Sequence, residues 1–203
     1  MKKYIGIVLT IFLLGGGVFV NEAEASVEGK TVALDAGHGG EDPGALDNGL
    51  HEKELVYDVA YRTKQRLEQA GAEVVMTRER DEYLPLEDRA EIANRKDADI
   101  FVSVHANAAA TPYAEGTETY HYPTSEEGQR LAFNLQEHMV DEFGSEDRGV
   151  KTANFSVLRN TEMPAALVEL GFVTNKQEAE RMKDSAFRNE AANALYLGIH
   201  QHF

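Results

Sequence analysis

Short apolar runs alternate with longer amphipathic stretches from Lys30 to the end of the chain, and this alternation limits the possible folds more than any other feature. The apolar runs predict strands at residues 31–35, 73–77, 99–105, 117–122, 155–158 and 165–169. The amphipathic stretches predict helices at residues 52–69, 85–96, 125–142, 176–182 and 186–201. Strands that are separated by helices form mainly parallel sheets covered on both faces. We therefore predict a single α/β domain built on a twisted, mainly parallel sheet.

Composition narrows the chemistry that such a domain can carry. The 203 residues suffice for one domain and a short extra segment, and we find neither a repeat nor a linker to an appended binding module. Because the chain has no cysteine, a transition metal would have to be held by histidine and carboxylate side chains. The formal net charge of −15, without a basic patch, argues against a nucleic-acid partner.

The first 25 residues have the layout of a targeting segment. Lys2 and Lys3 precede a nearly uncharged run over residues 4–20, which is followed by Ala23-Glu24-Ala25. This pattern predicts a secretory signal peptide at residues 1–25, cleaved after Ala25, and a catalytic domain at residues 26–203. The alternative is an uncleaved membrane anchor, because the apolar run is about long enough for a marginal span. Either interpretation places the domain outside the cytoplasm.

Polar side chains gather where three predicted strands end. His38 lies in a glycine-rich turn after the first strand, His105 ends the third, and Glu169 lies at the end of the last. In open sheets of this kind, ligands bind beyond the carboxyl ends of the strands. Three of the candidate residues also have an ordinary interpretation: His38 as a local hydrogen-bonding residue, Glu169 as a buried charge paired with an arginine, and Glu52, which begins the helix predicted at residues 52–69, as a favourable charge at a helix N-terminus.

The ordinary interpretations weaken when these residues are taken together. His38, His105 and Glu52 form a common catalytic zinc set that leaves the fourth position to water, whose pKa zinc lowers to about 7. If such a site hydrolyses an amide, it also needs a proton shuttle, because nitrogen leaves poorly unless it is protonated. Glu169, embedded among apolar residues, suits that role because burial raises the pKa of a carboxyl group.

Four segments carry a resemblance to a known family: residues 33–40 (ALDAGHGG), 52–53 (EK), 103–107 (SVHAN) and 168–175 (VELGFVTN). In this order and register they resemble the N-acetylmuramoyl-L-alanine amidases of the third amidase class. The resemblance implies a single α/β domain with a six-stranded mixed sheet, one zinc ion held by His38, Glu52 and His105, and Glu169 as the catalytic glutamate. Residues 77–78, Arg89 and residues 148–151 also resemble the family.

The resemblance implies an enzyme that acts on the bacterial cell wall, and the predicted signal peptide implies that it is secreted. Its reaction would be hydrolysis of the peptidoglycan amide bond between N-acetylmuramic acid and L-alanine, by zinc-activated water with a glutamate as general base. Three alternatives remain open: a zinc peptidase that cuts within the stem peptide, a non-catalytic wall-binding protein, and a membrane-anchored sporulation or division factor.

Two further expectations concern substrate and partners. We expect Arg148 to bind a carboxylate of the stem peptide, the alternative being a purely structural salt bridge. Some related amidases carry a helix after the second zinc histidine that covers the metal, but residues 106–115 contain Pro112 and are too few for such a helix. We therefore expect a loop at the rim of the cleft, no obligatory activator protein, and a monomer.

Overall fold

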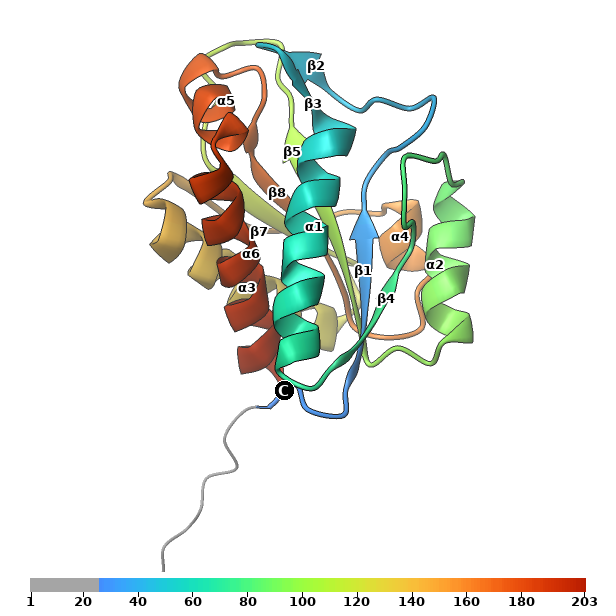
Figure 1. The fold of residues 1–203 in the computed structure, drawn as a ribbon. Coiled ribbons are helices and arrows are strands. Elements are labelled where there is room, and N and C mark those ends of the chain that lie inside the picture. Colours follow the sequence, from blue (N-terminus) through green and yellow to red (C-terminus); the bar gives the residue numbers. More distant parts are fainter. Residues whose placement is uncertain (1–25) are drawn as a thin grey trace, which may run out of the picture.

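The computed structural model describes residues 26–203, so the predicted signal peptide lies outside the described residues. The centre of the molecule is a six-stranded sheet in the order β4-β1-β5-β8-β6-β7 (Figure 1). Its strands are β1 (Thr31–Ala36), β4 (Glu73–Met76), β5 (Ile100–Asn107), β6 (Thr117–His121), β7 (Asp147–Thr152) and β8 (Ala165–Phe172). All neighbouring strands are parallel except β6 and β8, which are antiparallel. The predicted six-stranded, mainly parallel sheet is confirmed.

Helices cover both faces of this sheet, as predicted. The helices are α1 (Glu52–Gln69), α2 (Leu86–Arg95), α3 (Glu126–Phe143), α4 (Ser156–Arg159), α5 (Lys176–Lys183) and α6 (Ser185–His202). Alternate strand residues point to opposite faces. Val32 and Leu34 join the larger core beneath α1, α3 and α6, whereas Ala33 joins a smaller core beneath α2 and α4 (Figure 1).

One predicted strand is wrong and one observed strand was missed. Residues 155–158 were predicted as a strand, but Ser156–Arg159 form the short helix α4, which buries Val157 and Leu158 against the smaller core. The missed strand is β7, an edge strand whose side chains remain largely in contact with solvent. A short hairpin of β2 (Leu46–Asp47) and β3 (Leu50–His51) was also not predicted.

Helix boundaries follow local side-chain chemistry. The helix α1 begins at Glu52, as predicted. Ser125 caps α3, its hydroxyl oxygen accepting a hydrogen bond from the Gly128 backbone N–H. Pro85 is the residue before α2 and not part of its first turn. Within residues 26–203, we find no helix that is both long and apolar enough to cross a membrane.

Candidate metal centre and active site

His38, Glu52 and His105 converge from three separate elements. They follow β1, begin α1 and lie near the end of β5, respectively. The Nε2 atom of His38 and the Nδ1 atom of His105 each lie 3.0 Å from Oε1 of Glu52. One ligand atom from each residue lies within 4.8 Å of the other two, so these side chains can hold a metal ion together. The donor set of two imidazoles and one carboxylate fits zinc.

Glycine and two buried arginines shape the turn that carries His38. His38 itself adopts a φ of 60°, in the left-handed region that most side chains avoid. Arg78 donates to the carbonyl oxygens of residues 36 and 37, and Arg89 to those of residues 36 and 38. A Cβ on Gly37 would lie 2.3 Å from the ring of His105. The turn therefore needs glycine at position 37, and the arginines fix its strained backbone.

Asp42 orients the His38 ring. Its Oδ2 atom lies 2.8 Å from Nδ1 of His38, and a proton on Nδ1 leaves Nε2 free to bind a metal. Burial alone would lower the pKa of His38, but the adjacent carboxylates of Glu52 and Asp42 outweigh it and raise that pKa. The sequence prediction missed Asp42, although its position four residues after His38, beyond the glycine turn, was a usable signal.

The carboxylate of Glu52 is held on both oxygens by backbone groups. Oε1 accepts a hydrogen bond from the Ala106 N–H at 3.1 Å, and Oε2 accepts one from the Ala45 N–H at 2.7 Å. Burial alone would raise the pKa of Glu52, but hydrogen bonds and charge from His105 and His38 hold it well below its usual range. Glu52 is therefore an ionised, rigidly placed carboxylate.

Glu169 lies beside this cluster, and among residues 26–203 one of its carboxyl oxygens has no hydrogen-bond partner. It pairs in register with His105 across β5 and β8. Its Oε2 atom is buried without a hydrogen-bond partner among the described residues. Burial, followed by the negative charges of Glu52 and Glu118, raises the pKa of Glu169 well above its ordinary value. An unpartnered carboxyl group with a raised pKa is suited to proton transfer.

A second carboxylate, Glu118, faces Glu169 from β6 and is the hub of a polar cluster. Its Oε1 accepts hydrogen bonds from Asn107 and Tyr120, and its Oε2 accepts them from Arg148 at 2.7 Å and Lys151 at 2.5 Å. Burial alone would raise the pKa of Glu118, but the hydrogen bonds from Lys151, Tyr120 and Arg148 lower it to about 2. The sequence prediction named only Arg148 from this cluster.

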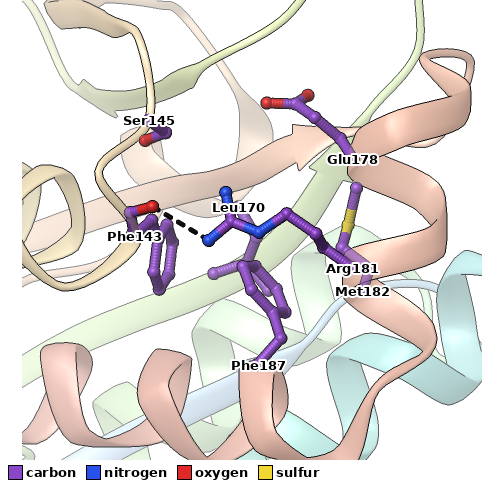
Figure 2. Close-up of a pocket in the computed structure, with 7 residues that line it drawn as sticks. All are labelled: Phe143, Ser145, Leu170, Glu178, Arg181, Met182 and Phe187. Atoms are coloured by element: carbon purple, nitrogen blue, oxygen red, sulfur yellow. Dashed lines mark hydrogen bonds between the residues drawn. The ribbon is translucent and has the colours of Figure 1, made fainter.

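A loop joins β5 and β6 as predicted, but it covers residues 108–116 and not 106–115, because β5 continues to Asn107. The helix α5 holds this loop in place. Glu178 of α5 accepts hydrogen bonds from the backbone N–H groups of Gly116 and Phe172, which joins the loop to the end of β8. Figure 2 shows Glu178 at a small cavity of about 10 Å³, where Arg181 donates to the carbonyl oxygen of Phe143. A cavity of this size holds at most one water molecule, so it is too small to be a substrate site.

Comparison with known proteins agrees with this geometry. The sequence model of the N-acetylmuramoyl-L-alanine amidase family matches residues 32–201. N-acetylmuramoyl-L-alanine amidase LytC of Bacillus subtilis is 39% identical over 180 residues, which are 88% of this chain and 36% of LytC. This chain thus spans only about a third of LytC.

Two solved structures have the same fold. The catalytic domain of CwlV, an N-acetylmuramoyl-L-alanine amidase from Bacillus (Paenibacillus) polymyxa var. colistinus, superposes with a TM-score of 0.81 at 35% identity, over 85% of this chain and 97% of that one. The CwlD amidase from Clostridioides difficile, solved in complex with the GerS lipoprotein, has a TM-score of 0.82 at 30% identity, over 85% of this chain and 98% of that one. The chain therefore belongs to the N-acetylmuramoyl-L-alanine amidase family of hydrolases.

Proposed function

We propose that this enzyme is a zinc-dependent amidase that hydrolyses the bond between N-acetylmuramic acid and L-alanine in bacterial peptidoglycan, outside the cytoplasm. The observation that carries the proposal is the convergence of His38, Glu52 and His105 beside the unpartnered carboxyl group of Glu169. When bound, zinc would supply a lowered pKa for water and polarisation of the scissile carbonyl.

The residues of the chain then divide the remaining work. His38, Glu52 and His105 would hold one zinc ion, and Asp42 would keep Nε2 of His38 directed at it. Glu169 would take a proton from the attacking water and deliver it to the leaving nitrogen, as its raised pKa allows. No lysine or arginine among residues 26–203 forms an ion pair with Glu169. Glu169 could therefore move a proton without first breaking an ion pair.

We further propose that Arg148 and Lys151 attract the carboxylates of the stem peptide. Both side chains are about one-third exposed while Glu118 holds their inner faces, so they can reach a ligand without losing their anchor. Arg148→Ala should raise KM and leave kcat nearly unchanged, and it should lower the free energy of unfolding by only about 1 kcal/mol or less, because Lys151 still pairs with Glu118. A large loss of stability with unchanged kinetics would favour a purely structural salt bridge.

The decisive experiment is digestion of purified peptidoglycan with and without a chelator, with the new chain ends identified by mass spectrometry. We expect free lactyl-muramoyl ends and free L-alanine amino ends, loss of both with the chelator, and their return with added zinc. New ends within the stem peptide would instead indicate a zinc peptidase. No new ends at all would indicate a non-catalytic wall-binding protein.

A matched variant tests the assignment of Glu169. Glu169→Gln keeps the size of the side chain but removes the proton acceptor, so kcat should fall by roughly 10²–10⁴ with zinc still bound. Zinc content, measured by mass spectrometry of the metal, separates the possible roles. Loss of zinc in this variant would make Glu169 a ligand, and near-normal activity would remove it from the mechanism.

We also propose that the domain is an active monomer that needs no activator protein. The loop at residues 108–116 supports this proposal, because it contains no helix that could cover the metal ligands. His38 and His105 keep 24% and 19% of their side-chain exposure, so solvent reaches them. Purified protein, residues 26–203, should therefore cut peptidoglycan with zinc alone. An inert domain that gains activity with a second protein would contradict this expectation.

A further inference from the structure

A cleft of about 290 Å³ opens beside the metal ligands, on the β1 side of the site. Its rim is formed by the segment between β4 and α2, which contains Tyr83, and by Leu86, the first residue of α2; these two side chains are 49% and 53% exposed. His38 and His105 form part of its inner wall. The proposed chemistry uses only that inner wall and leaves the apolar rim without a role.

The rim is fixed against the turn that carries His38. A Cβ on Gly40 would lie 2.5 Å from the backbone nitrogen of Tyr83, so the two segments are in direct contact. Asp81 accepts hydrogen bonds from the Gly40 N–H and from Lys53, and Arg89 donates to the Leu84 carbonyl oxygen. The apolar rim is therefore a preformed wall of the site.

The charged groups that line this cleft are already paired. Arg89 is 2% exposed, and its guanidinium donates to Asp35 and to three backbone carbonyl oxygens. Asp42 is bound to His38 and to the Gly44 N–H. A ligand in the cleft thus meets an aromatic ring, aliphatic side chains and no unpaired charge. Such a surface fits a neutral molecule with apolar faces.

The other side of the metal ligands has the opposite character. Arg148 and Lys151 lie there on the edge strand β7, with β5, β8 and β6 between them and β1. The substrate is asymmetric in the same way: its sugar is uncharged and presents C–H faces, whereas its stem peptide carries free carboxylates. Charge complementarity therefore assigns one end of the substrate to each side.

We infer that the cleft at Tyr83 and Leu86 is the subsite for the N-acetylmuramoyl sugar, so that the substrate crosses the strand ends with its stem peptide over β6 and β7. The inference rests on the proposed function, since it presumes the muramoyl–alanine bond as the scissile one. The pyranose ring packs on the Tyr83 ring and the Leu86 side chain, and the amide then lies between His38 and Glu169.

The test compares two substrates in the wild-type enzyme and in Tyr83→Ala and Leu86→Ala. One substrate is a disaccharide-peptide, and the other is the same peptide carrying only the lactyl group in place of the sugar. On the disaccharide-peptide, each variant should lose kcat/KM on the order of tenfold, as is usual when a side chain that contacts a ligand is truncated. On the lactyl peptide, the variants and the wild type should be nearly equal. Phe133→Ala, which removes a 59% exposed ring from α3, is the control and should match the wild type on both substrates.

The outcomes separate this inference from the proposed function. If the wild type cleaves the disaccharide-peptide at the muramoyl–alanine bond, the proposed function stands whatever the variants do. Equal loss on both substrates, or no loss in either variant, would overturn the sugar subsite. A loss in Tyr83→Ala that disappears when the peptide carboxylates are amidated would place the peptide in the cleft and reverse the orientation.

Discussion

Replacing Glu118 with glutamine removes the negative charge that Arg148 and Lys151 share, while the size of the side chain stays the same. Glu118 is 4% exposed, and its two oxygens accept four hydrogen bonds. An amide has only one acceptor oxygen, so the variant leaves two cations beside a neutral group that also carries N–H donors. We expect a loss of stability and a loosening of both cations.

The magnitude follows from the pKa of Glu118. Its lowering from 4.5 to about 2 corresponds to about 3 kcal/mol of stability at neutral pH, since one pKa unit is worth about 1.4 kcal/mol. Arg148 and Lys151 keep 34% and 37% of their side-chain exposure, and solvent therefore screens part of this attraction. We expect Glu118→Gln to lower the free energy of unfolding by roughly 1–2 kcal/mol.

The pH dependence gives the sharper assay. Because the folded-state pKa is the lower one, the stabilisation is complete above the unfolded pKa of 4.5 and is lost as the pH falls towards about 2. Urea unfolding followed by circular dichroism should therefore give a constant difference between wild type and variant from about pH 7 to 5, and a clearly smaller difference near pH 3.5. Glu127→Gln breaks an exposed pair with Arg130 and should leave stability nearly unchanged. A variant as stable as wild type at neutral pH, or a difference that persists unchanged in acid, would refute the reasoning.

Three other substitutions test the metal centre and its support. Gly37→Ala places a Cβ 2.3 Å from the His105 ring, so we expect loss of zinc binding by calorimetry; an unchanged zinc affinity would contradict that clash. Arg89→Met leaves the buried Asp35 carboxylate without its cation and should lower the free energy of unfolding, measured in urea, by about 3–5 kcal/mol. A decrease below about 1 kcal/mol would show that the ion pair is dispensable. Asp42→Asn should weaken zinc binding by about 10–100-fold with little change in folding stability, and an equal affinity would remove it from the support of the metal centre.

Most of the sheet could be predicted because its strands are buried and continuous in apolar residues. Residues 100–104 are completely covered in the folded protein, and their sequence already reads as a buried strand. The strand β7 gave no such signal, since its sequence, DRGVKT, has only Val150 as an apolar residue. An edge strand is specified by backbone pairing and not by burial, so apolar periodicity does not find it. The strand predicted at residues 155–158 is wrong for a different reason. Most of these residues are apolar, but an apolar run of this length does not distinguish a strand from a helical turn.

The sequence likewise predicted only part of the candidate site. The sequence placed His38, His105 and Glu169 together because the ends of parallel strands meet at one edge of a sheet, and the structure brings them together. Their supporting residues could not be located in this way. Glu118 lies in a strand that runs antiparallel to β8, and the register of that pairing sets it opposite Glu169. The sequence gives no indication of strand direction at this point, so the hub of the polar cluster was missed.

The position of Glu118 opposite Glu169 also explains why no arginine or lysine among the described residues pairs with Glu169. One interpretation of the sequence was that Glu169 forms a buried ion pair with an arginine. Across the two strands, however, Arg148 and Lys151 are bound by Glu118, whose pKa falls to about 2, and none of the described residues bonds to Oε2 of Glu169. The negative charge of Glu118 is in turn one of the causes that raise the pKa of Glu169. In many active sites, the surroundings of two neighbouring carboxyl groups move their pKa values in opposite directions. One group then stays ionised, and the other can carry a proton. In the mechanism proposed here, Glu118 would thus hold the two cations for the substrate, and Glu169 would be left to move the proton.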